Sequence, residues 1–220
     1  MSALFSPIVE RAVETAAEWH DGTSRKGRWR APFVVSPEGE PARVPTMAHL
    51  ATVALTVQRA GWDDEVVAAA FLHDALEDPD RHGRRLARAA LVDRVGEAVA
   101  VLVEAVSEPQ LDAAGRRLPW RDRKRAYLRG LAEAPVGAVA VSLADKLHNA
   151  YAMASALEAG VDVFSSAPGR TALSAGPADQ AWFFRAVLAA SEGHDDARLA
   201  PMRERLAEEV ARFARAARLG

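Results

Sequence analysis

The stretch Phe71-Leu72-His73-Asp74-Ala75-Leu76-Glu77-Asp78 holds four groups that can bind a metal ion or move a proton. An apolar run that begins at Val66 leads directly into it. Burying an unpaired carboxylate costs more free energy than the packing of its apolar neighbours returns. A bound metal ion is one way to neutralise such charges. The stretch therefore indicates a polar site beside a buried helix.

Helical spacing predicts that these four groups lie together, because side chains three and four residues apart share a helix face. We predict a helix from about residue 63 that Pro79 ends, which would direct four side chains into one pocket, namely His73, Asp74, Glu77 and Asp78. The alternative is a surface site, where these groups pair with Arg81, Arg84 and Arg85.

Two polar residues far from this stretch interrupt apolar helical patterns. His49 lies in an apolar pattern that begins at Thr46, and Asp145 lies in the almost wholly apolar segment 136–147. Charged residues are rarely buried without a partner. The chain thus offers His, then His-Asp, then Asp as one candidate ligand set.

Length and composition predict a single mostly α-helical domain over residues 1–220, because half of the residues are apolar, alanine and leucine are abundant and aromatic residues are few. The net charge of −2 carries no electrostatic footprint of nucleic-acid binding. With no cysteine, any metal must be held by histidine and carboxylates. We expect a cytoplasmic protein, since no membrane-spanning stretch or leader is evident. The oligomeric state stays open.

The periodicity places the other elements. Prolines confine a small β-hairpin insertion near residues 33–44 to an edge or a loose loop. We expect residues 108–119 to form a loop and the charged helix after it to present a solvated face. Helices are predicted at 8–20, 46–61, 63–78, 83–95, 97–106, from 119 onwards, and at 136–158, 178–190 and 197–219.

Two extended motifs resemble one known family. Residues 72–78, LHDALED, look like the "LHDxxED" signature, and residues 143–149, LADKLHN, look like the "LADxLHN" signature. Both are typical of the HD-domain metal-dependent phosphohydrolases, in the (p)ppGpp hydrolase branch formed by RelA/SpoT proteins and their small stand-alone relatives. Arg25-Lys26-Gly27 resembles a third segment of that branch. The similarity extends from about Val13 to Arg185.

The resemblance implies roles for individual residues. Glu77 and Asp78 would position or deprotonate a water molecule, Arg25 and Lys26 would receive a diphosphate, and Asn149 would hydrogen-bond the nucleotide. The family's metal is Mn²⁺, although imidazole and carboxylate ligands suit Fe²⁺ or Zn²⁺ equally. Its implied ligands are His49, His73, Asp74 and Asp145.

The implied reaction is hydrolysis of the 3′-pyrophosphate of ppGpp or pppGpp, which yields GDP or GTP and pyrophosphate. One alternative substrate is another phosphorylated nucleotide, either a nucleoside monophosphate or NADPH. A catalytically dead nucleotide-binding module is the remaining alternative. Two departures from the family pattern are present. Leu50 replaces a proline, which bears on the start of the helix, and a longer stretch between Lys26 and His49 bears on specificity.

Other polar and aromatic residues receive no catalytic role. We interpret His148 as a packing or supporting group rather than a ligand, and Lys146 as uninvolved. We expect the aromatic run 182–184 to belong to the core rather than to stack on guanine.

Overall fold

The computed structural model describes residues 4–25, 44–166 and 172–219, and within these ranges its regular secondary structure is all helical, apart from two isolated β-bridges. This confirms the predicted all-α fold. The helices are α1 (Pro7–Trp19), α2 (Thr46–Arg59), α3 (Asp64–Leu72), α4 (Arg88–Val95), α5 (Glu97–Ala105), α6 (Trp120–Ala132), α7 (Val136–Glu158), α8 (Pro177–Ser191) and α9 (Leu199–Ala216).

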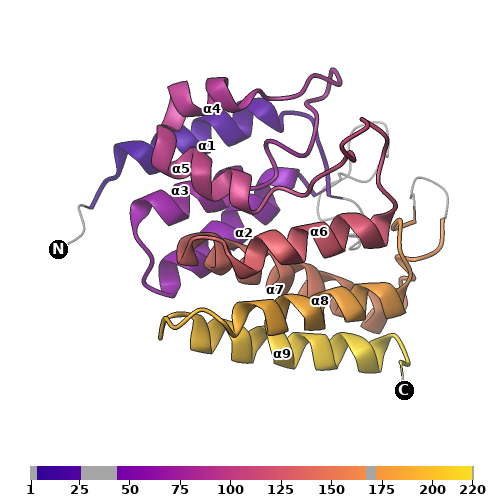
Figure 1. The fold of residues 1–220 in the computed structure, drawn as a ribbon. Coiled ribbons are helices and arrows are strands. Elements are labelled where there is room, and N and C mark those ends of the chain that lie inside the picture. The colour runs from indigo at the N-terminus through magenta and orange to yellow at the C-terminus, as the bar shows by residue number, and fades with distance from the viewer. Residues whose placement is uncertain (1–3, 26–43, 167–171, 220) are drawn as a thin grey trace, which may run out of the picture.

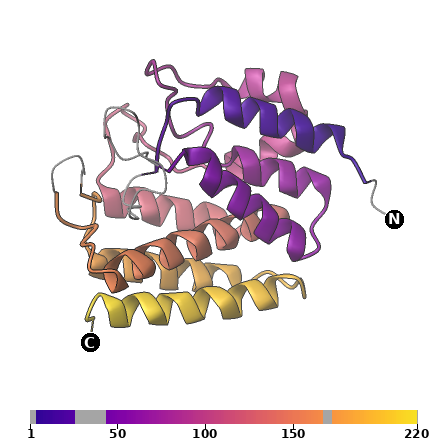
Figure 2. The same ribbon diagram turned by 180° about the vertical axis from the view of Figure 1, so that it is seen from behind.

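Helix α7 is the central element of the bundle (Figure 1). It packs against α2 and α3 on one side and against α8 and α9 on the other, while α1, α4 and α5 extend the group around α3. The reverse view shows α9 as the outermost helix beyond α7, with the N-terminal helices at the opposite side (Figure 2). The longest apolar segment of the sequence therefore occupies the middle of the fold.

The packing of α7 is tight where it meets α3. Every residue from 137 to 145 is buried, so this part of the helix has no solvated face. A Cβ added to Gly137 would lie 2.7 Å from Cγ2 of Val66, well inside a normal carbon–carbon contact. Val66 is itself buried, and its branched side chain has little rotational freedom. Glycine is therefore required at this helix crossing.

We expect Gly137→Ala to destabilise the protein by about 1–2 kcal/mol, because overpacking a core costs more than the gain in helix propensity returns. The matched control is Gly130→Ala in α6, where a Cβ meets nothing within 4 Å. That change should be neutral or stabilising by up to about 1 kcal/mol. Urea unfolding of both variants measures the difference. A Gly137→Ala protein as stable as wild type would contradict the close approach.

The predicted continuation of α3 as far as Asp78 is wrong. The helix ends at Leu72, and residues 73–78 form a series of turns. Two backbone N–H groups, those of Glu77 and Asp78, both donate to the carbonyl of Asp74, at 3.1 and 2.9 Å. The indole Nε1–H of Trp19 holds the carbonyl of Asp78 at 2.9 Å, which draws this end of the turns towards α1. Residues 73–78 therefore lie in a series of tight turns and do not share one helix face.

The predicted start of α4 at Gly83 is also wrong, since the helix begins at Arg88. Asp80 explains the difference, because its Oδ1 accepts from the backbone N–H groups of His82 and Arg84 at 2.9 and 2.8 Å. Gly83 has φ of +79°, which glycine adopts without strain. A side chain that satisfies loop amides competes with helix formation.

The proposed hairpin at residues 33–44 lies outside the described residues, except for Val44. The described residues before and after this segment pair with each other. Ser24 forms an antiparallel bridge with Pro45, and the N–H of Arg25 donates to the carbonyl of Val44 at 2.9 Å. This pairing fixes Arg25 beside the start of α2. In the described part of the chain, no helix is long and apolar enough to cross a membrane.

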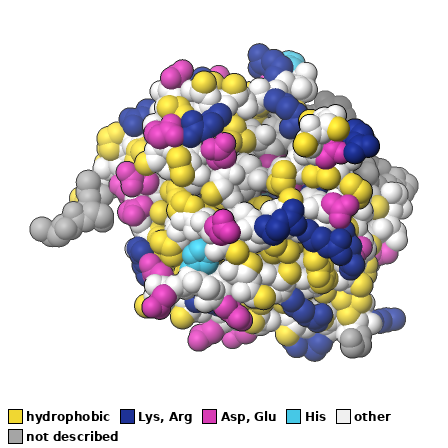
Figure 3. Space-filling view, in the orientation of Figure 1, with side chains coloured by type: hydrophobic (Ala, Val, Ile, Leu, Met, Phe, Trp, Pro, Cys, Tyr) yellow, Lys and Arg dark blue, Asp and Glu magenta, His cyan; other side chains and the backbone are white. Residues whose placement is uncertain are grey.

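The face seen in Figure 3 carries Lys and Arg side chains interspersed with Asp and Glu. This mixture agrees with the net charge of −2. Two of the three residues of the aromatic run, Phe183 and Phe184, are buried in the core, as predicted.

Candidate active site

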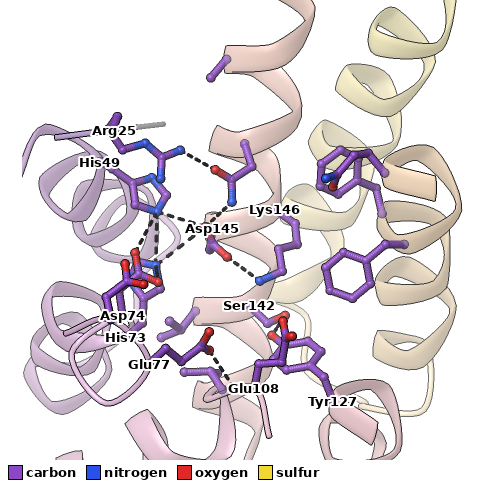
Figure 4. A pocket seen from close by; sticks show the side chains of 18 of the residues that line it. Arg25, His49, His73, Asp74, Glu77, Glu108, Tyr127, Ser142, Asp145 and Lys146 are labelled. Carbon is purple, nitrogen blue, oxygen red and sulfur yellow. Dashed lines mark hydrogen bonds and ion pairs between the residues drawn. The ribbon is translucent and has the colours of Figure 1, made fainter. Parts of the chain in front are cut away.

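A cavity of about 310 Å³ opens where the turns after α3 face α2 and α7 (Figure 4). Its wall combines residues that are far apart in the sequence. Most of the predicted site residues line it, namely Arg25, His49, His73, Asp74, Glu77, Asp78, Asp145 and Asn149. Lys26 lies outside the described residues.

Three of the residues predicted as metal ligands, namely His49, His73 and Asp74, form a group that could hold one ion, and Asp145 lies beside the two histidines. The Nε2 atoms of His49 and His73 are 3.2 Å apart. Oδ1 of Asp145 lies 3.1 Å from Nε2 of His49 and 3.7 Å from Nε2 of His73. Asp74 completes the group, with Oδ1 3.3 Å from Nε2 of His73 and Oδ2 3.8 Å from Nε2 of His49.

These separations fit a shared metal ion. Imidazole nitrogen binds such ions at about 2.0–2.1 Å, so ligand atoms at right angles around one ion are about 3 Å apart. The Nδ1 atom of His73 contacts the carbonyl of Ala70 at 2.8 Å. That carbonyl can only accept, so Nδ1 carries a proton, and Nε2 is the nitrogen that can bind a metal ion once it has lost its own proton. The donor set is thus oriented for a cation.

The charges of the group also favour a bound cation. Burial disfavours protonation of His73, but the charge of Asp74, the contacts with Asp145 and the hydrogen bond to Ala70 together outweigh it, and the pKa of His73 rises to about 9. Burial likewise opposes ionisation of Asp145, yet Lys146 and the two histidines hold its pKa well below the usual range. The carboxylates therefore stay ionised and require positive charge beside them.

Glu77 has a different environment from the two aspartates. Its Oε1 accepts from the backbone N–H of Glu108 at 2.7 Å, which orients the carboxyl group into the cavity. Burial, and then the negative charge of Asp74, raise the pKa of Glu77 to about 7. A carboxyl group with a pKa near neutrality can both accept and release a proton at physiological pH. Asp78 lines the same cavity and is more exposed.

Arg25 is linked to the histidine and aspartate cluster through Asn149. Its Nη2 donates to Oδ1 of Asn149 at 2.5 Å, and Nδ2 of Asn149 donates to Oδ1 of Asp145 at 2.6 Å. The Nε–H of Arg25 is buried and has no hydrogen-bond partner among the described residues. A buried donor without a partner is costly, and the side chain of Arg25 lines the cavity.

The cavity also contains a cationic and aromatic end that the sequence analysis missed. Lys124 and Lys146 both line it, with Nζ at 4.5 and 5.5 Å from the ring centre of Phe183. The prediction that the start of α6 is a solvated face is wrong at Lys124, which is mostly buried and paired with Glu108. Lys146 donates to Oδ2 of Asp145 at 2.5 Å and so is part of the site rather than uninvolved.

A signal for Lys124 was present in the sequence. The apolar residues Trp120, Tyr127 and Leu131 share one face of α6 with Lys124, because they follow one another at intervals of four, three and four residues. Periodicity thus places Lys124 on the buried stripe even though the segment is dense in charge. The partner Glu108 lies in a loop, where no periodic signal exists.

Comparison with known proteins assigns the fold to a family. A family model described as the HD domain matches residues 31–167, which is more than half of the chain. The chain belongs to the HD domain family. The all-α HD-domain prediction is thereby confirmed, and the matched residues include the His73-Asp74 dipeptide of the cluster.

This HD domain is similar to the guanosine-3′,5′-bis(diphosphate) 3′-pyrophosphohydrolase of Aquifex aeolicus (strain VF5), with 36% identity over 100 residues. The match covers 46% of this chain but only 12% of that relative. The chain therefore corresponds to a small part of the Aquifex protein.

Two solved structures share the fold. One is a metazoan ortholog of SpoT that hydrolyses ppGpp and plays a role in starvation responses, with a TM-score of 0.63 and 22% identity. It covers 94% of this chain and 96% of its own. The other is lmo0812 from Listeria monocytogenes EGD-e, with a TM-score of 0.61 and 27% identity, covering 77% of this chain and 97% of its own.

Proposed function

We propose that this HD domain is a metal-dependent phosphohydrolase that removes the 3′-pyrophosphate from ppGpp or pppGpp and leaves GDP or GTP. The observation that carries the proposal is the buried cluster of two histidines and two aspartates beside a carboxyl group with a pKa of about 7. Similarity to the Aquifex pyrophosphohydrolase and the fold shared with the SpoT ortholog support the choice of substrate.

The proposed metal ligands are His49, His73, Asp74 and Asp145, and the proposed ion is Mn²⁺. When bound, the ion would lower the pKa of a coordinated water and offset charge on the phosphoryl oxygens. Ligand type alone does not select Mn²⁺ over Fe²⁺ or Zn²⁺, so the choice of Mn²⁺ rests on the motifs shared with the (p)ppGpp hydrolase branch.

Glu77 is the proposed general base, and Asp78 helps to orient the attacking water. The hydrogen bond from Glu108 fixes Glu77 while leaving its second oxygen for a water molecule. A base with a pKa near the working pH is ionised in a large share of molecules and still accepts a proton readily. The more exposed Asp78 reaches the same cavity from the end of the turns.

Arg25, Lys26 and Asn149 are the proposed substrate-binding residues. The planar guanidinium of Arg25 suits a phosphate group, Arg25 lines the cavity, and its Nε–H has no hydrogen-bond partner among the described residues. Asn149 links Arg25 to Asp145, so its amide would set the distance between the bound nucleotide and the metal ligands. Lys26 follows Arg25 directly in the chain and is included on the motif alone.

The released product tests the proposal. Protein loaded with Mn²⁺ is incubated separately with ppGpp, NADPH and a panel of nucleoside monophosphates, and the liberated phosphate species is identified. We expect pyrophosphate from ppGpp, with His73→Ala as the inactive control. Orthophosphate from NADPH or a monophosphate, without pyrophosphate from ppGpp, would overturn the proposed substrate. It would favour the alternative substrate, another phosphorylated nucleotide. Nucleotide binding without any product would indicate a binding module.

We further propose that residues 1–220 act as one domain on a free nucleotide in the cytoplasm. The central position of α7, which contacts helices from both halves of the chain, supports a single unit. The near-neutral charge balance supports a small-molecule substrate rather than nucleic acid.

A further inference from the structure

His148 lies directly behind the proposed metal ligand His49. It is buried, and its Nδ1 is 2.6 Å from Nδ1 of His49. The two rings meet edge to edge, with centroids 4.9 Å apart and an angle of 24° between their planes. The opposite edge of the His49 ring carries Nε2, which faces Asp145 and His73. His49 is therefore held between the carboxylate and imidazole group on one edge and His148 on the other.

The short contact contains one proton, and the position of that proton follows from the role of His49. Two bare ring nitrogens would repel each other at 2.6 Å, and so would two protonated ones. A histidine that binds a metal ion through Nε2 carries its proton on Nδ1. The Nδ1–H of His49 must then donate to Nδ1 of His148. His148 accepts through Nδ1, and its own proton lies on Nε2.

The second histidine of the cluster is oriented by different means. Nδ1 of His73 donates to the carbonyl of Ala70, a main-chain group that no side-chain substitution removes. His49 instead depends on a side chain. Helix α7 thus supplies both the ligand Asp145 and, three residues later, the group that orients a ligand on α2.

We propose that His148 is a positioning residue, which fixes the tautomer and ring orientation of His49 so that its Nε2 lone pair points at the metal. This inference rests on the proposed metal site. Groups that orient a metal-bound histidine typically change metal affinity by about 10–100-fold when they are removed.

A second cavity beside His148 should allow the fold to tolerate a smaller side chain at this position. This cavity of about 240 Å³ is lined by His148 together with Thr52, Thr56, Leu147, Tyr151, Arg205 and Glu209. It lies beside α2, α7 and α9. A smaller side chain at position 148 would extend existing space rather than open a hole in close-packed core.

The test compares two variants of nearly equal shape. In His148→Asn the amide oxygen occupies the place of Nδ1 and still accepts a hydrogen bond, whereas in His148→Leu a methyl group lies there. Calorimetry with Mn²⁺ alone should give about 10–100-fold weaker binding for the leucine variant, and binding within about threefold of wild type for the asparagine variant. Equal affinity in all three proteins, or an equal loss in both variants, would overturn the proposal.

Wild-type protein offers an independent measurement. Loaded with diamagnetic Zn²⁺, it should show the Nε2–H tautomer of His148 in long-range ¹H–¹⁵N spectra of the imidazole rings. A proton on Nδ1 of His148 would overturn the proposal even if both variants failed to fold. Wild type that takes up neither Mn²⁺ nor Zn²⁺ would instead remove the metal site itself, and with it the premise of this inference.

Discussion

Asp145→Asn should abolish metal-dependent activity while leaving the helical fold intact. We expect affinity for Mn²⁺ to fall by at least about a hundredfold, since losing a group that only orients a ligand already costs about 10–100-fold. We expect hydrolysis of ppGpp to fall by about a thousandfold or more, because the stabilisation that a metal gives to transition-state charge is worth several kcal/mol.

The contacts of Asp145 explain why so small a change has so large an effect. Its Oδ1 lies 3.1 Å from Nε2 of His49 and also accepts from Asn149, while its Oδ2 accepts from Lys146 at 2.5 Å. An amide can present only one accepting atom to these neighbours. Its NH₂ group would then replace one carboxylate oxygen, either beside the ligand cluster, where a negatively charged metal-binding atom is lost, or beside the Lys146 ammonium, which offers it no acceptor.

The control for this prediction is Asp93→Asn, which removes a carboxylate from an exposed position on α4. Calorimetry with Mn²⁺, thermal melting and pyrophosphate release are measured for both variants. Asp93→Asn should match wild type in all three. Normal metal affinity in the Asp145→Asn protein would contradict the assignment of Asp145 as a ligand.

The cluster that Asp145 belongs to was recoverable from the sequence because each member breaks an apolar pattern. His49 and Asp145 interrupt buried helices, and such residues are expected only where a partner or an ion compensates them. The structure brings both within 4 Å of His73 or Asp74. The fold was predictable for a related reason, since helical periodicity is strong throughout and the two extended motifs match a family.

The local geometry of the signature was not recoverable by the same reasoning. Periodicity assigned residues 73–78 to a helix, and the true turns depend on long-range bonds, such as the one from Trp19 to the carbonyl of Asp78. Asp80 similarly satisfies loop amides that a helix would otherwise use. Contacts between segments, rather than local preference, decide the structure at both places.

The prediction from charge density was wrong at one residue of α6. A segment with many basic residues suggests solvent exposure, yet Lys124 pairs with the buried carboxylate of Glu108 and lies over the ring of Phe183. The partner comes from a loop 16 residues earlier. Burial of a lysine depends on such a partner, which composition does not locate.

Glu77→Gln should make the metal-free protein more stable and the loaded enzyme nearly inactive. The folded protein raises the pKa of Glu77 from the ordinary 4.5 to about 7, first through burial and then through Asp74. Folding therefore favours the protonated carboxyl group. The stability that comes from this preference is complete below about pH 4.5 and is lost as the pH rises through 7.

Glutamine stays neutral and still accepts the hydrogen bond from the N–H of Glu108. The variant should therefore equal wild type in stability near pH 4.5 and exceed it by about 1–2 kcal/mol at pH 8. One pKa unit corresponds to about 1.4 kcal/mol, and partial contact of the side chain with water reduces the full value. Urea unfolding of metal-free protein at pH 4.5, 6 and 8 measures the difference.

Activity should change in the opposite direction. Loss of a general base costs about 10²–10⁴-fold in rate, so pyrophosphate release at pH 8 should fall by that factor although Mn²⁺ affinity is retained. The control Glu204→Gln lies at an exposed position of α9 and should change neither stability nor activity. A stability gain without loss of activity would leave Glu77 as a buried acid outside the reaction and would pass the role of base to Asp78. Ionised Glu77 destabilises the fold for the same reasons that keep its pKa near neutrality, namely burial and the charge of Asp74. The gain in stability and the loss of activity are therefore expected together.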